Sequence, residues 1–161
     1  MLIRLLQIGK TDDAYLLEGI QKYGKRIPYY NSFETITLPG FKYSDLNQLE
    51  KLKQREAEAI LKNIGLNDFT VLLDENGKEL TSVEFSYFID QFNPLGNLSG
   101  HSRLNFIIGG AYGFSPLLYE KAQAKISLSR MTFSHQMVRL IFMEQLYRAF
   151  TILKKEPYHH I

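Results

Sequence analysis

The fold of this chain is decided by residues 126–161, which read ISLSRMTFSHQMVRLIFMEQLYRAFTILKKEPYHHI. The alternating run Ile126–Ser129 predicts a short strand. Residues 130–133 form a turn, and Ser134 is placed to cap a helix, because a serine oxygen accepts the unpaired N–H groups of a first helical turn. The stretch therefore predicts a strand that leads through a turn into a long C-terminal helix.

This predicted helix has two apolar sectors instead of one. At about 100° per residue, the first sector contains Val138, Phe142, Leu146, Ala149, Ile152 and Leu153. The second contains Leu140, Met143, Tyr147 and Phe150. A helix that is apolar on two sides is buried on two sides, and for so short a chain we expect the second partner to be another subunit. A central helix inside a single chain is the alternative.

Strand and helix patterns alternate in the rest of the chain. Strands are expected at residues 2–8, 34–38, 69–73 and 104–108. Helices are expected after the capping residues Thr11 or Asp12, Ser44 or Asp45, Thr81, and Ser115. Because short connections join them, residues 1–161 are predicted to form a single α/β domain with a mainly parallel sheet flanked by helices.

Composition excludes several classes of protein. No run approaches the roughly 18 apolar residues of a membrane span, and the N-terminus does not resemble a signal peptide. The chain has no cysteine, so disulfides and thiolate metal sites are excluded and a cytoplasmic location is expected. His159 and His160 lack a third ligand nearby, so we expect no bound metal. Because no apolar run is long enough to span a membrane, we also expect no membrane partner.

Charge is distributed unevenly along the chain. Residues 121–161 carry seven basic and two acidic side chains, a balance of +5, whereas residues 1–120 carry 12 basic and 15 acidic ones, a balance of −3. The net charge of +2 does not by itself indicate nucleic-acid binding. The asymmetry favours a negatively charged partner at the C-terminal end.

Three of the predicted strands end in segments suited to binding a ligand. These segments are Leu73–Asp74, Gly109–Gly110 and Leu128–Phe133. In an open α/β sheet ligands collect beyond the carboxyl ends of strands, and glycine lets a ligand approach the backbone. The glycine segment alone reads equally well as a tight turn, because it has neither dinucleotide-fold nor P-loop spacing. Asp74 is either a catalytic carboxylate or a turn former.

Several motifs become specific when they are taken together. They are LLDENGKELTS at 72–82, FIIGGAYGFSP at 106–116, SLSRMTFSHQMVRLIFMEQLYRAFTI at 127–152 and EPYHH at 156–160. With the opening IRLLQIGK at 3–10, they closely resemble the ribosomal RNA large-subunit methyltransferase H family of the SPOUT superfamily. The resemblance covers the whole chain.

This resemblance implies both a fold and an activity. The C-terminal segment would be threaded into a trefoil knot, a rare exception to normal chain topology, and the active unit would be a homodimer. The activity would be methyl transfer from S-adenosylmethionine to N3 of a pseudouridine in 23S ribosomal RNA of the assembled ribosome. The alternatives are a SPOUT methyltransferase acting on transfer RNA and a non-enzymatic ribosome-binding module.

The resemblance also implies which residues contact the cofactor. By position these are Leu73, Gly109, Leu128, Ser129, Arg130, Met131, Thr132 and Phe133. Two residues depart from the family pattern: Ser134 stands where proline is typical, and Tyr112 stands where a smaller or acidic residue is usual.

Catalysis requires the loss of the N3–H proton of the base, whose pKa lies roughly at 9–10, near that of tyrosine. The candidate catalytic residues are Arg139, which would stabilise the charge of the deprotonated base, and Tyr158 and His159, which would close over it. Glu144 would either pair with Arg148 or assist proton removal. RNA would be bound by Arg130, Arg139, Arg148, Lys154, Lys155 and the loop 93–102.

Overall fold

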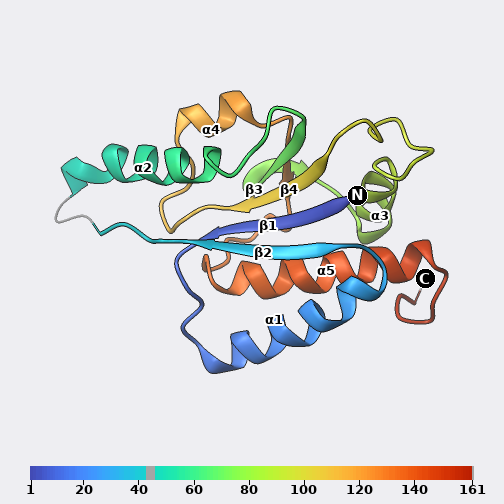
Figure 1. Cartoon of the computed structure of the whole chain (residues 1–161). Helices are drawn as coiled ribbons and strands as arrows, with labels where there is room; N and C mark the ends of the chain where they lie inside the picture. The colour runs from blue at the N-terminus through green and yellow to red at the C-terminus, as the bar shows by residue number, and fades with distance from the viewer. Residues whose placement is uncertain (43–45, 161) are drawn as a thin grey trace.

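Five parallel strands form one sheet in the order β2-β1-β4-β3-β5. The computed structural model describes residues 1–42 and 46–160 (Figure 1). The strands are β1 (Leu2–Ile8), β2 (Phe33–Leu38), β3 (Asp68–Glu79), β4 (Arg103–Ile108) and β5 (Ala124–Ser127). The predicted α/β domain with a parallel sheet is therefore confirmed.

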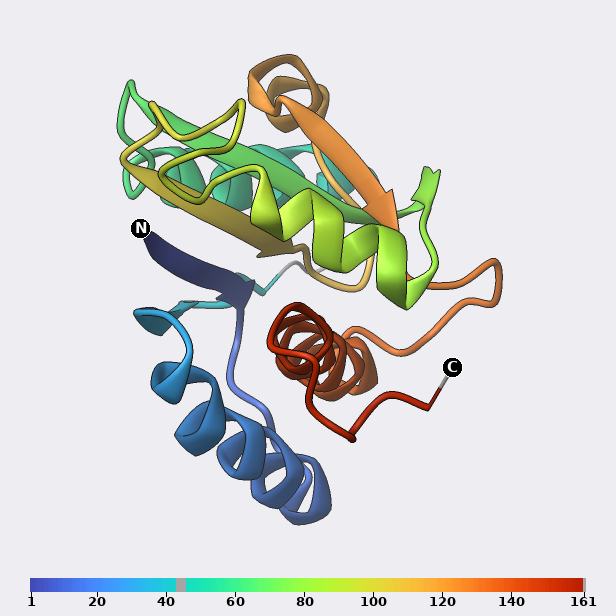
Figure 2. The same cartoon turned by 90° about the vertical axis from the view of Figure 1, so that its right-hand side faces the viewer.

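Helices cover both faces of the sheet. One face packs against α1 (Ala14–Arg26), α3 (Ser82–Asp90) and α5 (Met137–Leu153), and the other against α2 (Leu49–Leu61) and α4 (Pro116–Lys121) (Figures 1 and 2). Two short 3-10 helices, Ile27–Tyr29 and Leu46–Gln48, complete the elements. Strands buried on both faces explain the nearly continuous apolar runs of β1 and β4.

The long helix α5 lies between α1 and α3 (Figure 2). A Cβ atom at Gly19 of α1 would lie 2.7 Å from Leu140 Cδ1, and the rings of Tyr23 and Tyr147 are 5.7 Å apart. The second apolar sector of α5 is thus covered by α1 of the same chain, not by another subunit as expected. The two apolar sectors of α5 are explained by its position as a central helix within one chain, so they are not evidence for a second subunit.

The edge pair β3–β5 differs from its prediction. The strand expected at residues 69–73 extends to Glu79, so residues 74–77 lie inside β3, and the pairing with β5 shifts register between Leu73 and Lys78. Gly77 permits this pairing, because a Cβ there would lie 2.6 Å from the carbonyl carbon of Ile126. β5 ends at Ser127, two residues earlier than predicted, so Leu128 and Ser129 belong to the connection that follows it.

The helix starts follow the predicted chemistry in part. Thr81 and Glu84 form the predicted capping box of α3. Ser134 Oγ accepts the N–H of Met137 at 3.0 Å, although α5 begins only at Met137. The first helix begins after Asp13, not Thr11 or Asp12, and the predicted caps Ser44 and Asp45 lie outside the described residues. Among the described helices, none is long and apolar enough to cross a membrane.

A buried charge cluster joins the amino ends of β3 and β4. Asp68 has 1% side-chain exposure and accepts hydrogen bonds from Arg103 Nε (2.9 Å), Asn105 Nδ2 (3.1 Å) and the N–H of Gly65 (2.8 Å). Burial would raise the pKa of Asp68, but the bonds from Arg103, Gly65 and Asn105 outweigh it and hold that pKa below 3.8. The carboxylate is therefore stabilised in its charged form.

Replacing this carboxylate should weaken the fold. Asp68→Asn is expected to lower the free energy of unfolding by about 2 kcal/mol at neutral pH, less than for a fully buried pair because a third of Arg103 is exposed. The contribution of Asp68 is present above its ordinary pKa and lost as pH falls through its lowered one, so the two proteins should converge in acid. Urea denaturation measures the difference, with exposed Asp13→Asn as the control. Equal losses in both variants would contradict the assignment.

Candidate functional site

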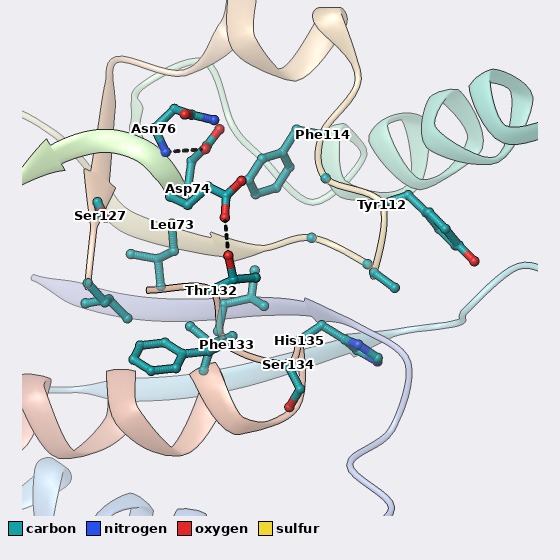
Figure 3. A pocket seen from close by; sticks show the side chains of 18 of the residues that line it. Leu73, Asp74, Asn76, Tyr112, Phe114, Ser127, Thr132, Phe133, Ser134 and His135 are labelled. Carbon is teal, nitrogen blue, oxygen red and sulfur yellow. Dashed lines mark hydrogen bonds between the residues drawn. The ribbon is translucent and has the colours of Figure 1, made fainter. Parts of the chain in front are cut away.

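A cavity of about 750 Å³ opens at the carboxyl edge of the sheet (Figure 3). Its walls come from three segments, 73–76, 108–114 and 127–135, with Lys53, Tyr119 and Val138 completing the lining. The parallel register pairs Leu72 with Ile107 and Leu73 with Ile126. The irregular part of β3 after Leu73 therefore meets the connections that leave β4 and β5, so the three segments predicted to bind a ligand lie together.

Most of the predicted cofactor contacts line this cavity. Those that do so are Leu73, Gly109, Leu128, Ser129, Met131, Thr132 and Phe133. The side chain of Arg130 is the exception, because it is 85% exposed and pairs with Glu79 at 3.5 Å. The binding role of all eight residues remains a prediction.

The segment that follows β5 is held by its own serine and threonine side chains. Ser127 Oγ donates to the carbonyl of Ser129 at 2.8 Å, and Ser129 Oγ accepts the N–H of Met131 at 2.9 Å. Thr132 Oγ1 donates to Glu75 Oε2 at 3.1 Å and so ties this segment to the one that follows Leu73 (Figure 3). Short hydroxyl side chains stabilise such turns by bonding the nearby backbone, which gives the cavity wall a fixed shape.

The carboxylate of Asp74 lies at the cavity and is held by two hydrogen bonds. It accepts the N–H of Asn76 at 2.9 Å, a bond typical of a turn former, and also accepts the hydroxyl of Tyr119. Burial, followed by this bond to Asp74, raises the pKa of Tyr119 to about 12. The phenol is therefore protonated near neutral pH and keeps the carboxylate in place.

The glycine segment is enclosed from two sides. A Cβ at Gly109 would lie 3.0 Å from the Phe114 ring, and one at Gly110 would lie 2.8 Å from Glu56 Oε1. Gly113 has a φ of 78°, in the left-handed region that favours glycine. Each of the three glycines is thus required by a contact or by backbone conformation.

Sequence reasoning missed Glu56, which supports the glycine segment from α2. Its side chain is buried, and the backbone N–H of Gly110 bonds to it. Burial raises the pKa of Glu56 above 4.5, and the bond from Gly110 offsets part of that rise. The sequence pattern could have predicted this burial, because Glu56 lies four residues after Leu52 and four before Ile60, on the apolar face of the helix.

Arg139 lies close to the cavity without lining it. Its side chain is fully buried and donates from Nη2 to the carbonyl of Ile8 at 2.6 Å and from Nη1 to Thr11 Oγ1 at 2.9 Å. Burial lowers its pKa, and the charge of Asp12 acts in the opposite direction. Arg139 is inaccessible to RNA phosphates, which corrects its predicted RNA contact; its catalytic role remains a prediction.

The other two predicted catalytic residues, Tyr158 and His159, pack against the middle of α5. Tyr158 donates to Glu144 Oε1 at 3.1 Å, and His159 Nδ1 lies 3.2 Å from Arg148 Nη1. The predicted pair of Glu144 and Arg148 is present, with Nε and Oε1 3.0 Å apart. Glu144 and Arg148 lie six and ten residues after Val138, the residue of α5 that lines the cavity, or about 9 and 15 Å along the helix axis. Neither Tyr158 nor His159 lines the cavity of its own chain.

Comparisons with known proteins agree over nearly the whole chain. The family described as "Predicted SPOUT methyltransferase" matches residues 1–159. Proteins named ribosomal RNA large subunit methyltransferase H from Parabacteroides distasonis and Christiangramia forsetii are 48% and 51% identical over 161 and 160 residues, each covering 99% of both chains. A crystal structure of a hypothetical protein, 15% identical, matches with a TM-score of 0.53 over 94% of this chain and 68% of its own, and supports the fold alone.

Adding a methyl group to the glycine segment should disturb the fold. Gly110→Ala is expected to lower the free energy of unfolding by about 1–3 kcal/mol, because the new Cβ collides with the buried Glu56 carboxylate. Gly100→Ala is the matched control, since nothing lies within 4 Å of a Cβ there. Urea denaturation of both variants tests this difference, and equal stability of the two would refute the close contact.

Because the pKa of Glu56 is raised, ionisation of this side chain should lower the stability of the folded protein as pH rises. Between pH 4.5 and the raised pKa, the folded protein holds a proton that the unfolded chain releases, so this contribution to stability is lost as pH rises. Glu56→Gln keeps an acceptor for Gly110 and should gain stability over the natural protein from about pH 4.5 to about pH 8. Unfolding at both pH values, with exposed Glu58→Gln alongside, measures the gain; a constant difference would contradict the burial argument.

Proposed function

This chain belongs to the SPOUT methyltransferase family, and on that premise we propose that it methylates N3 of a pseudouridine in 23S ribosomal RNA. The methyl donor is S-adenosylmethionine, and the substrate is the assembled ribosome in the cytoplasm. The relatives' shared name supports the class of RNA, and the family supports the class of reaction.

The observation that carries this proposal is the cavity formed by the three strand ends. Its volume of about 750 Å³ lies within the usual range for small-molecule sites. Leu73, Leu128 and Phe133 offer apolar surface to an adenine ring, and the open space beside Gly113, where a Cβ would meet nothing within 4 Å, leaves room for the ribose and methionine parts. The residues present therefore fit S-adenosylmethionine.

When bound, S-adenosylmethionine supplies a methyl group already activated by its sulfonium. The protein's main task is then to align the donor with the nucleotide, so a rigid cavity wall is what the reaction needs. The bonds from Ser127 and Thr132 supply that rigidity for the segment after β5.

Proton removal from N3 is assigned to the cluster around the tail. Burial, the bond with Tyr23 and the charge of Glu144 raise the pKa of Tyr158, so its phenol is a hydrogen-bond donor near neutral pH. Arg148 can only donate, so its bond occupies the acceptor nitrogen Nδ1 of His159, and His159 takes the proton at Nδ1 once that bond is released. Arg139 contributes a buried positive charge that favours the deprotonated base.

These assignments are best met by two copies of the chain. Neither Tyr158 nor His159 lines the cavity of its own chain, and the residues that hold them, Glu144 and Arg148, lie about 9 and 15 Å along α5 from Val138 at the cavity. We therefore propose a homodimer whose cavities are each completed by the partner's tail. A C-terminal trefoil knot belongs to the same proposal and follows from the family resemblance.

Cofactor binding and methyl transfer test this function directly. S-adenosylmethionine at about 100 times its Kd should stabilise the protein by about 2.7 kcal/mol, seen as a rise in Tm. Methyl-labelled cofactor should then label ribosomes that lack the modification, and not transfer RNA. Labelling of transfer RNA alone would support the other enzyme, and the absence of both thermal shift and labelling would overturn the proposal.

A further inference from the structure

The exposed side of α1 carries a row of basic side chains. Lys22, Lys25 and Arg26 are all exposed, and their spacing of three and four residues places them on one side of the helix. Tyr29 follows in the next turn with 87% of its surface exposed. An aromatic ring this exposed makes little contribution to the core.

The turn after α5 lies against the same end of α1. The Arg26 guanidinium lies 5.7 Å from the ring centre of Tyr147 in α5, and the Tyr30 hydroxyl donates to Glu156 Oε2 at 2.6 Å. These contacts bring Lys154 and Lys155, both exposed, to the end of the row. We call Lys22, Lys25, Arg26, Tyr29, Lys154 and Lys155 the basic–aromatic patch.

The cations of the patch form no ion pair within the described part of the chain. This distinguishes them from Arg148, which is bonded to Glu144, and from Arg139, which is buried. The carboxylates nearest in sequence are Glu18, one turn before Lys22, and Glu156, which accepts from Tyr30. The patch therefore keeps a surplus of positive charge in solvent.

We propose that the basic–aromatic patch binds the ribosomal RNA strand, with its cations on phosphates and Tyr29 stacked on an unpaired base. Cations beside an exposed aromatic ring suit a single-stranded nucleic acid, because every base offers a face for stacking. The patch also adjoins the tail that carries Tyr158, so RNA held there lies beside the residues assigned to proton removal. This inference rests on the proposed function.

The test compares paired lysine substitutions on two helices. Lys22→Gln/Lys25→Gln removes two cations of the patch, and Lys51→Gln/Lys62→Gln removes two exposed lysines, one in α2 and one at its C-terminal cap, as the control. Binding to unmethylated ribosomes and to protein-free 23S RNA is measured over a range of salt concentrations. Relative to the natural protein, the slope of log K against log[salt] should become less negative by about 0.7–0.9 for each lysine removed from the patch. The control variant should keep the slope of the natural protein.

Tyr29→Ala separates stacking from charge. It should weaken RNA binding by about tenfold with an unchanged salt slope, because it removes a ring and no charge. Equal slopes for the patch and control pairs would overturn the proposal. Weaker binding to ribosomes with unchanged binding to protein-free RNA would also overturn it, in favour of a ribosomal protein partner.

The thermal shift with S-adenosylmethionine is measured for the natural protein and every variant. Because no patch residue lines the cavity, all variants should keep the shift. A natural protein without any shift would defeat the proposed function, whereas normal shifts with equal salt slopes would defeat the patch alone.

Discussion

The parallel pairing of β4 with β3, and of β3 with β5, is the constraint on which the rest of the structure depends. Parallel neighbours end at the same edge of a sheet, with adjacent strands about 4.8 Å apart. The irregular part of β3 after Leu73 therefore lies beside the connections that follow Ile108 and Ser127. The cavity between them is lined by the glycines of 109–113 and by short hydroxyl side chains of 127–134.

Two buried charges fix this edge to the helices on both sides of the sheet. Glu56 of α2 bonds the backbone of Gly110, and Arg139 of α5 bonds the carbonyl of Ile8. A buried charge is costly unless it is hydrogen-bonded, and each of these bonds a connection that leaves the sheet. Their positions make the edge rigid, which is what a site that aligns two reactants requires.

The helix α5 separates two sets of functional groups. The chain at its N-terminal end contributes His135 and Val138 to the cavity, whereas Glu144 and Arg148 hold the tail against the middle of the helix. The tail does not line the cavity of its own chain. The proposed homodimer follows from that separation, because it places the tail of one chain beside the cavity of its partner.

Local chemistry in the sequence determined the alternation of strands and helices and the capping box of Thr81 and Glu84. These depend on neighbours within about one helical turn or one strand, so a periodic pattern records them. Only the tertiary structure decided that α1 covers the second sector of α5, that Glu56 and Arg139 are buried, and that β3 continues past Leu73. Each of these depends on contacts between residues tens of positions apart, and a glutamate or arginine on a helix has the same local pattern whether or not another layer of the fold covers it.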